Sequence, residues 1–391
     1  MNTQLLLVGG EDHHLRIPFM RQLRDQGFKV AAAGPGDPEP FQQAGFAFHG
    51  FAFRRFINPA ADWRAVGALR RVLATVRPDV VQSFDTKPNL LLPLAARPFA
   101  DLAVIRTING LGWLYSSRSA AAMGLRPVFC ALHRLAARST AATVFQNRED
   151  QAFFEAHDML GDGTSQVIPG SGVDPETFAQ ARVAGPSIEH LRQQLGLGGA
   201  PVVLTVTRLT RQKGIPTLLA AAALVHQQRP DVRFLLVGPR ESEGAQAISQ
   251  WELDRHAPYL TAIGARSDVP SLLGLADVFA FPTEYREGVP RVLLEASLAE
   301  LPIVTTIMPG CSDVINEGWN GYLVPPRSPF ALAARILDVL GNPAQARILG
   351  GRARELVIRN FSLTGTVAQY VHLYRDIVAG DTVAHGSGAL A

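Results

Sequence analysis

Short apolar runs alternate with amphipathic helical patterns along the chain, and this alternation restricts the available folds more than any other feature. Residues 5–8 form such a run, followed by a loop at Gly9 and Gly10 and a helical pattern that extends to Gln26. Apolar runs of this length are typical of strands buried on both faces. The repeated strand–helix unit therefore predicts an α/β protein with parallel sheets covered by helices.

The alternation occurs in two series, separated by residues 169–175, which read PGSGVDP and are typical of a link between domains. The expected strands are residues 5–8, 29–33, 79–82, 103–107 and 143–145 in the first series, and 202–207, 234–237, 278–282, 303–305 and 321–324 in the second. The chain has 391 residues, a length suited to two domains. We therefore expect two doubly wound domains, 1–172 and 173–362, with one helix over 338–358, another over 363–379, and a disordered tail at 380–391.

Charge is unevenly distributed between the two halves. Residues 1–172 contain 18 Lys and Arg against 14 Asp and Glu, which gives +4, whereas the remainder contains 19 against 20, which gives −1. This asymmetry favours an anionic partner for the first half, either a phosphorylated substrate or a membrane surface. No nucleic-acid motif accompanies it, so no nucleic-acid partner is expected.

No uncharged apolar run reaches the roughly 18 residues that a membrane-spanning helix needs. The first residues lack the basic region of a signal peptide, and Cys130 and Cys311 have no metal-ligand spacing. We therefore expect reduced thiols and a cytoplasmic protein that meets a membrane only peripherally. Residues 113–139 carry aromatic residues and four arginines without an acidic residue. They fit either a surface that lies on an anionic bilayer or a core helix with a solvated basic face.

The segment 284–296, EYREGVPRVLLEA, directly follows the expected strand 278–282. Pro290 suits the first turn of a helix, and Gly288 lets the backbone approach a ligand closely. A helix start near Val289, Pro290 and Arg291 would present free N–H groups to a diphosphate. The alternative is an ordinary capped surface helix.

Glu287 and Glu295 are eight residues apart, which corresponds to about 12 Å if both lie in one helix. Glycosidase carboxylates that flank one bond are closer, at roughly 5–9.5 Å. We therefore expect the two glutamates to bind different parts of one long ligand, Glu287 the donor sugar and Glu295 the ribose. Two solvated glutamates are the alternative reading.

Arg208 and Lys213 follow the expected strand 202–207, where a basic pair can bind phosphate and stabilise a departing diphosphate. An exposed basic loop is the alternative. The chain contains no Asp-x-Asp, so a metal clamp on the diphosphate is not supported and neither a metal nor a cofactor is expected. The absence of G-x-G-x-x-G and of a P-loop also argues against dinucleotide and ATP sites.

Several polar residues of the first half follow expected strands and are candidates for the acceptor side. They are His14, Lys87, Asn89 and Asn109, while Gly10 is a candidate for contact with the donor. Loops after the strands of a parallel sheet collect at the edge where ligands bind. Turn formation and solvation are the alternative explanations for the same residues.

Several motifs in order resemble those of the family 4 glycosyltransferases: residues 207–214, Glu287 to Glu295, 309–313 and 320–326. The resemblance implies the GT-B fold, two Rossmann-like domains facing a central cleft, retention of anomeric configuration and no metal requirement. It also implies that Glu287, Arg208 and Lys213 are the catalytic residues. The residues expected to bind the donor are Gly10, Gly288, Val289, Pro290, Arg291 and Glu295. The helix 363–379 is expected to pack back on the first, acceptor-binding domain.

Residues 83–89 and 107–112 are similar to the subgroup that extends undecaprenyl-diphosphate-linked sugars. This similarity implies transfer of a hexose or N-acetylhexosamine from a UDP-sugar to a lipid-linked saccharide in surface polysaccharide synthesis. Many family members have a histidine where Asn109 stands, and an amide cannot titrate. A transferase with a soluble acceptor, a sugar-nucleotide 2-epimerase of the same fold and a silent sugar-nucleotide binder are the alternatives.

Overall fold

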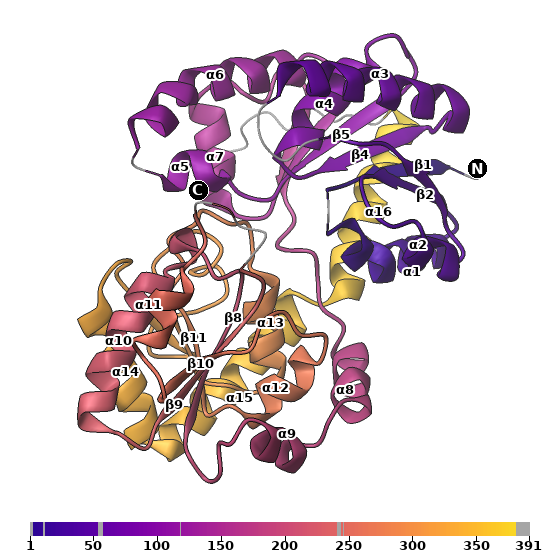
Figure 1. Cartoon of the computed structure of the whole chain (residues 1–391). Helices are drawn as coiled ribbons and strands as arrows, with labels where there is room; N and C mark the ends of the chain where they lie inside the picture. Colours follow the sequence, from indigo (N-terminus) through magenta and orange to yellow (C-terminus); the bar gives the residue numbers. More distant parts are fainter. Residues whose placement is uncertain are drawn as a thin grey trace, which may run out of the picture. The chain divides into compact units, whose positions relative to one another are not determined.

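The computed structural model describes residues 3–10, 12–53, 58–117, 119–240, 244 and 246–380. The chain divides into two compact units (Figure 1). Unit 1 consists of Met1–Ser171 together with the chain from Leu363 onward, and unit 2 is Gly172–Ser362. The division falls inside the predicted link at 169–175.

Among the described residues of unit 1, seven parallel strands form one sheet in the order β3-β2-β1-β4-β5-β6-β7. The strands are β1 Gln4–Val8, β2 Lys29–Gly34, β3 Ala47–Gly50, β4 Val80–Phe84, β5 Ala103–Ile108, β6 Ala142–Phe145 and β7 Thr164–Val167. The helices are η1 His13–Arg16, α1 Ile17–Asp25, α2 Glu39–Gln43, α3 Pro59–Val76, α4 Thr86–Ala96, α5 Gly112–Ser116, α6 Ala120–Ala137, α7 Arg148–Ala156 and α16 Leu363–Ala379.

Both faces of this sheet are buried. Leu5 and Leu7 of β1 pack with residues of α1 and α16, whereas Leu6 and Val8 pack with residues of α3 and α4. The period-2 alternation of a strand therefore sends neighbouring residues into two separate cores, which explains the uninterrupted apolar run. The C-terminal helix α16 contributes Tyr374, whose hydroxyl donates to Gln82 of β4.

Unit 2 contains a six-stranded parallel sheet in its described residues, with the order β10-β9-β8-β11-β12-β13. The strands are β8 Val202–Val206, β9 Arg233–Val237, β10 Leu260–Ala262, β11 Val278–Phe281, β12 Ile303–Thr306 and β13 Tyr322–Val324. The helices are α8 Pro175–Ala184, α9 Ile188–Gln194, η2 Arg211–Lys213, α10 Ile215–Gln228, α11 Gln250–Asp254, α12 Val269–Leu275, α13 Arg291–Leu298, α14 Pro329–Gly341 and α15 Pro343–Asn360.

The six strands of the second sheet and the first six strands of the first sheet have the same order, 3-2-1-4-5-6, in which the direction of winding reverses between the first and fourth strands; β7 is added at the edge of the first sheet. The amino edges are also built alike. The Asp79 carboxylate accepts a hydrogen bond from Gln4 N at 2.7 Å, and the Asp277 carboxylate accepts one from Val202 N at 2.8 Å.

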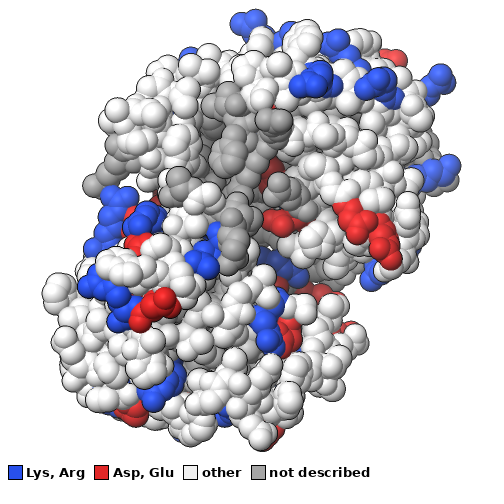
Figure 2. Space-filling view, in the orientation of Figure 1, with Lys and Arg blue, Asp and Glu red and all other residues white. Residues whose placement is uncertain are grey.

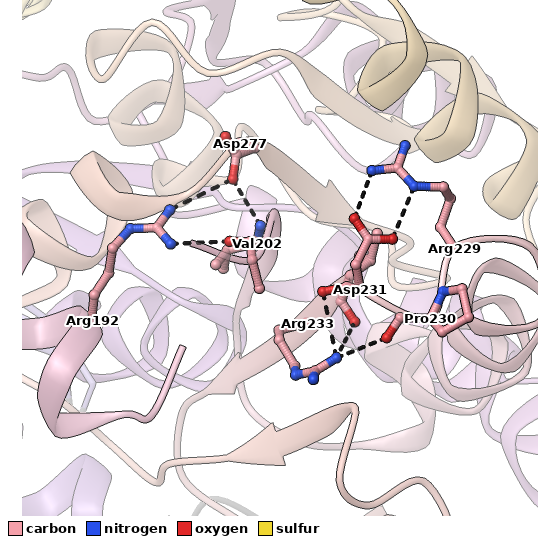
Figure 3. Close-up of polar contacts among 9 residues, drawn as sticks. Arg192, Val202, Arg229, Pro230, Asp231, Arg233 and Asp277 are labelled. Atoms are coloured by element: carbon pink, nitrogen blue, oxygen red, sulfur yellow. Dashed lines mark hydrogen bonds and ion pairs between the residues drawn. The ribbon is translucent and has the colours of Figure 1, made fainter. Parts of the chain in front are cut away.

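Figure 3 shows further polar contacts around the amino edge of the second sheet. Arg192 lies 3.8 Å from the Asp277 carboxylate, and Arg229 donates twice to Asp231. Because these groups surround the starts of strands, they stabilise the edge opposite to the one where ligands bind in such sheets.

The predicted doubly wound class and all ten predicted strands are confirmed. Three short strands, β3, β7 and β10, were not predicted. The single helix expected at 338–358 is wrong, because Asn342 lies between α14 and α15 and accepts from Gln345 N at the start of α15. Of the predicted disordered tail 380–391, residues 381–391 lie outside the described residues.

Candidate active site

The loops that follow β8 and β11 meet at the carboxyl edge of the second sheet. These strands are neighbours and mark the point where the winding reverses, which is where open α/β sheets bind ligands. The loop after β8 carries Arg208 and ends in η2 with Lys213, and the loop after β11 carries Glu287. The predicted cationic and anionic residues therefore share one edge.

Lys213 and Glu287 form a direct ion pair. Lys213 Nζ lies 2.6 Å from Glu287 Oε1, and the side chains are only 8% and 19% exposed. The hydroxyl of Thr283 also donates to Glu287 Oε1 at 3.2 Å, and the ammonium group lies 5.1 Å from the ring centroid of Tyr285. Both charged groups are largely shielded from solvent, so Lys213 does not belong to an exposed basic loop, which was the alternative interpretation.

Glycines allow the loops to approach this closely. Gly214 has φ +70°, and a Cβ there would lie 1.7 Å from Pro282 O. A Cβ on Gly310, with φ +81°, would lie 1.5 Å from Gly288 O. Backbone contact of this kind excludes any larger residue. The loops after β8 and β11 are also joined by a backbone hydrogen bond, in which Glu284 N donates to Gln212 O at 2.9 Å.

Helix α13 begins at Arg291, directly after the Glu287 loop. Pro290 is its N-cap, one position before the predicted first turn, and has no side-chain acceptor for the first N–H groups of the helix. Gly288, Val289 and Pro290 are buried. The first turn therefore presents backbone N–H groups and the positive end of the helix dipole.

Glu295 lies one turn into α13 and is paired with Arg291, whose Nε is 2.9 Å from Glu295 Oε1. Its side chain is 23% exposed. Glu287 lies in the loop and Glu295 in the helix, so the two carboxylates occupy different elements and point to different partners. Arg208 is half-buried in the loop after β8, while the exposed Arg211 pairs with the half-buried Glu252 at 2.8 Å.

In unit 1, Asp85 joins the loops at the carboxyl edge. The Asp85 carboxylate accepts from Gly10 N at 3.0 Å and from Asn109 Nδ2 at 3.2 Å. Gln146 Nε2 donates to Asn109 Oδ1 at 3.2 Å. Gly10, a candidate for contact with the donor, and Asn109, a candidate for the acceptor side, are thus brought together by Asp85, which directly follows β4.

The other acceptor-side candidates do not join this group. Lys87 and Asn89 belong to helix α4 rather than to a turn, and Lys87 Nζ pairs with Asp62 Oδ1 at 2.6 Å. Asn89 is buried, accepts from Ser83 Oγ and donates to Thr107 O. The expectation that Asn89 points to the acceptor is therefore wrong, because its amide satisfies polar groups in the interior.

His14 is exposed on η1, whereas the adjacent His13 is buried and its Nε2 donates to Leu7 O at 3.1 Å. Because a neutral ring can only donate to a carbonyl, Nε2 carries the proton. Burial lowers the pKa of His13 to about 3, and the neighbouring Arg16 acts in the same direction. A Cβ on Gly9 would lie 2.0 Å from His13 Nδ1, so Gly9 makes room for this ring.

Two further observations concern metals and thiols. Among the residues that the structure places, no three His, Cys, Asp or Glu side chains gather in a group that could hold a metal ion. Cys130 and Cys311 are free and buried, and burial raises the pKa of the Cys311 thiol to about 12.

In the part of the chain that the structure describes, every helix is too short or too polar to span a lipid bilayer.

Two family models match the chain, one to each half. Residues 19–169 match the glycosyl transferase 4-like domain, and residues 187–356 match the model described as glycosyl transferases group 1. The two matches follow the division into units.

The chain is also similar to characterised transferases. It is 26% identical over 332 residues to N,N'-diacetylbacillosaminyl-diphospho-undecaprenol alpha-1,3-N-acetylgalactosaminyltransferase of Campylobacter jejuni, covering 84% of this chain and 86% of the relative. It is 26% identical over 328 residues to UDP-Gal:alpha-D-GlcNAc-diphosphoundecaprenol alpha-1,3-galactosyltransferase of Escherichia coli, covering 83% and 82%.

The crystal structure of Anabaena HepE in complex with UDP has the same fold. The TM-score is 0.77 at 20% identity, and the match covers 96% of this chain and 100% of HepE. The architecture is therefore GT-B, with two Rossmann-like domains.

Proposed function

Because this chain belongs to the family 4 glycosyltransferases, we propose that it transfers a sugar from a UDP-sugar to a saccharide carried on a polyprenyl diphosphate. The observation that supports this most directly is the buried Lys213–Glu287 pair at the winding reversal of the second sheet. In this proposal the Lys213 ammonium group binds the diphosphate and the neighbouring Glu287 carboxylate binds sugar hydroxyls. Unit 2 would bind the donor and unit 1 the acceptor.

Each residue at the donor edge has a distinct role in this proposal. Arg208 and Lys213 neutralise the diphosphate as negative charge develops on it, together with the first N–H groups of α13. Glu287 accepts hydrogen bonds from the donor sugar, and Glu295 from the ribose diol. Lys213 has three N–H donors, so it can hold Glu287 and a phosphate oxygen at once.

The reaction would proceed with retention and without a metal ion. The bond from the anomeric carbon to the diphosphate breaks, the acceptor oxygen bonds to the same face, and the acceptor proton passes to the leaving phosphate. Positive charge on Arg208 and Lys213 takes the place of a metal clamp. Both relatives are named for alpha-1,3 transfer, and a donor whose sugar is α-linked to its diphosphate reaches such a product with retention.

A lipid-linked acceptor requires contact with a bilayer surface, and α6 is the segment we propose for it. Met123, Val128 and Leu132 of α6 are 50%, 51% and 41% exposed. Residues 113–139 contain no acidic side chain. Basic residues gather on unit 1 over α3, where Arg64, Arg70 and Arg71 are exposed (Figure 2), and α4 packs against both α3 and α6. This combination of apolar and basic groups fits the cytoplasmic, anionic face of a membrane.

A donor panel tests the reaction. UDP- and GDP-sugars are incubated in EDTA, with and without polyprenyl-diphosphate saccharides, and products are identified by mass spectrometry. We expect sugar transfer from a UDP-sugar to the lipid-linked saccharide only. Epimerised nucleotide sugar would indicate a 2-epimerase, and transfer to soluble sugars alone would indicate a soluble acceptor. A strict requirement for Mg²⁺ or Mn²⁺ would contradict the metal-free donor site.

Vesicle sedimentation tests the membrane contact. The double variant Val128→Ser with Leu132→Ser should bind phosphatidylglycerol-containing vesicles at least about fivefold more weakly than wild type. Trp251→Ser, which alters a side chain 65% exposed on unit 2, is the matched control and should bind normally. Equal binding of all three proteins would remove α6 from the contact.

A further inference from the structure

Asp85 occupies the winding reversal of the first sheet. It directly follows β4, and β4 lies beside β1 (Figure 1), whose loop contains Gly10. In unit 2 the corresponding place, between β8 and β11, holds Lys213 and Glu287. Ligands of open α/β sheets bind at this point, so Asp85 lies where unit 1 is expected to take its substrate.

The carboxylate is held by neighbours without being saturated by them. It accepts from Gly10 N at 3.0 Å and from Asn109 Nδ2 at 3.2 Å, while the guanidinium of Arg16 lies 4.0 Å away. A carboxylate can accept about four hydrogen bonds. The side chain is 43% exposed, so the remaining acceptor capacity is accessible to hydroxyl groups.

Two backbone features are adapted to this placement. Asp85 has φ +72° and ψ 158°, a conformation that is almost restricted to glycine and that persists in folded proteins mainly at functional sites. A Cβ on Gly10 would lie 2.9 Å from Asp85 Oδ2, so glycine at position 10 lets the carboxylate approach the β1 loop. The strained backbone of Asp85 and the small size of Gly10 thus occur at the same contact.

Comparison with Asp79 separates this role from simple strand capping. Asp79 precedes β4 and caps the start of β1, and Asp277 does the same for β8. The position six residues after Asp277 is Thr283, which donates to the donor-site Glu287, and the position six residues after Asp79 is Asp85. Asp79 and Asp277, at the amino edges, thus have the same structural role in the two sheets. Asp85 and Thr283 lie instead at the carboxyl edges, beside the candidate sites.

We propose that Asp85 binds hydroxyl groups of the acceptor saccharide, with Gly10 and Asn109 positioning its carboxylate. The inference rests on the proposed transferase function and assigns the acceptor sugar to a specific carboxylate. A carboxylate suits this task because sugar hydroxyls donate strongly to charged acceptors. An asparagine at position 85 retains an acceptor for Gly10 N but offers N–H groups in place of the second oxygen.

Binding of short-chain probes tests the proposal without requiring turnover. Citronellyl-diphosphate-linked N-acetylglucosamine and citronellyl diphosphate alone are titrated into wild type, Asp85→Asn and Asp79→Asn, with UDP as a reference ligand and binding followed by NMR. We expect Asp85→Asn to weaken the sugar-linked probe about tenfold or more. Citronellyl diphosphate and UDP should bind all three proteins equally, and Asp79→Asn should bind every probe as wild type does.

Two results would overturn the assignment: equal affinity of Asp85→Asn and wild type for the sugar-linked probe, or no preference of wild type for that probe over citronellyl diphosphate. If Asp85→Asn unfolds, Asp85→Gly replaces it, because glycine adopts this backbone without strain. Failure of the transferase proposal is a separate result, namely no sugar transfer in the donor panel, and does not depend on these affinities.

Discussion

Lys213 Nζ and Glu287 Oε1 lie 2.6 Å apart, although 74 residues separate them in sequence. The pair joins the loop after β8 to the loop after β11, with both side chains largely shielded from water. Charges in such a place interact more strongly than on the surface, and each compensates the desolvation of the other. The pair therefore stabilises the carboxyl edge of the second sheet.

A double-mutant cycle measures this coupling. Lys213→Met and Glu287→Gln should each lower the free energy of unfolding of unit 2 by about 2 kcal/mol, because each leaves a partner uncompensated. The double variant should cost about 1–2 kcal/mol less than the sum of the single variants. Denaturant unfolding provides the values. Arg359→Ala, which breaks the exposed pair of Arg359 with Glu355, is the control and should leave stability unchanged. Strict additivity would contradict the coupling.

Steady-state kinetics with the donor identified in the panel should distinguish the two glutamates of the donor segment. Glu287→Gln should lower kcat by about 100-fold or more, since it weakens contacts to the reacting sugar. Glu295→Gln should raise the donor KM about tenfold with little change in kcat, since the ribose does not react. Glu317→Gln, on an exposed glutamate of unit 2 away from this edge, is the control. The reverse pattern of kcat and KM would exchange the two roles.

Gly214→Ala should disrupt the donor edge through a steric contact with the backbone. Gly214 and Gly318 have nearly the same φ, +70° and +71°, but a Cβ meets Pro282 O at 1.7 Å in the first case and no described atom within 4 Å in the second. Gly318→Ala therefore isolates the cost of the left-handed backbone, about 1 kcal/mol. We expect Gly214→Ala to lower the thermal stability more than Gly318→Ala does. Gly214→Ala should also weaken UDP binding, and calorimetry measures both effects. Equal behaviour of the two variants would exclude the contact as the cause.

His13 should make unit 1 sensitive to acid. Its pKa is about 3 in the folded protein against 6.5 when unperturbed, so between these values the unfolded chain binds more protons and stability falls as the pH falls. From pH 7 to pH 5 this amounts to about 2 kcal/mol. His13→Gln keeps a donor for Leu7 O and does not titrate.

Hydrogen exchange of β1 amides at both pH values reports the stability of unit 1. Between pH 7 and pH 5, the free energy of unfolding of unit 1 should fall by about 2 kcal/mol more in wild type than in His13→Gln. His14→Gln alters the exposed neighbour and should follow wild type. Parallel losses in wild type and His13→Gln would show that His13 is not held neutral by burial.

Much of the fold could be predicted because its signals are local. A run such as residues 5–8 is apolar at every position since both faces of β1 are covered, and Gly27 follows α1 where its pattern stops. The short strand β10 was missed because three residues, one of them buried, carry too little periodicity. The break between α14 and α15 was missed although Asn342 and Pro343 together form a recognisable cap.

The candidate site was predictable in composition but not in its contacts. The sequence alone determined two parallel α/β units and the placement of Arg208, Lys213 and Glu287 after strands, because periodicity and motif spacing are properties of neighbouring residues. Only the tertiary structure decided that Lys213 pairs with Glu287 and that the Asn89 amide is buried and hydrogen-bonded in the interior. It also decided that Asp85 joins Gly10 to Asn109. These pairings depend on strand order, which brings together loops far apart in the chain, and on the requirement that buried polar groups find partners.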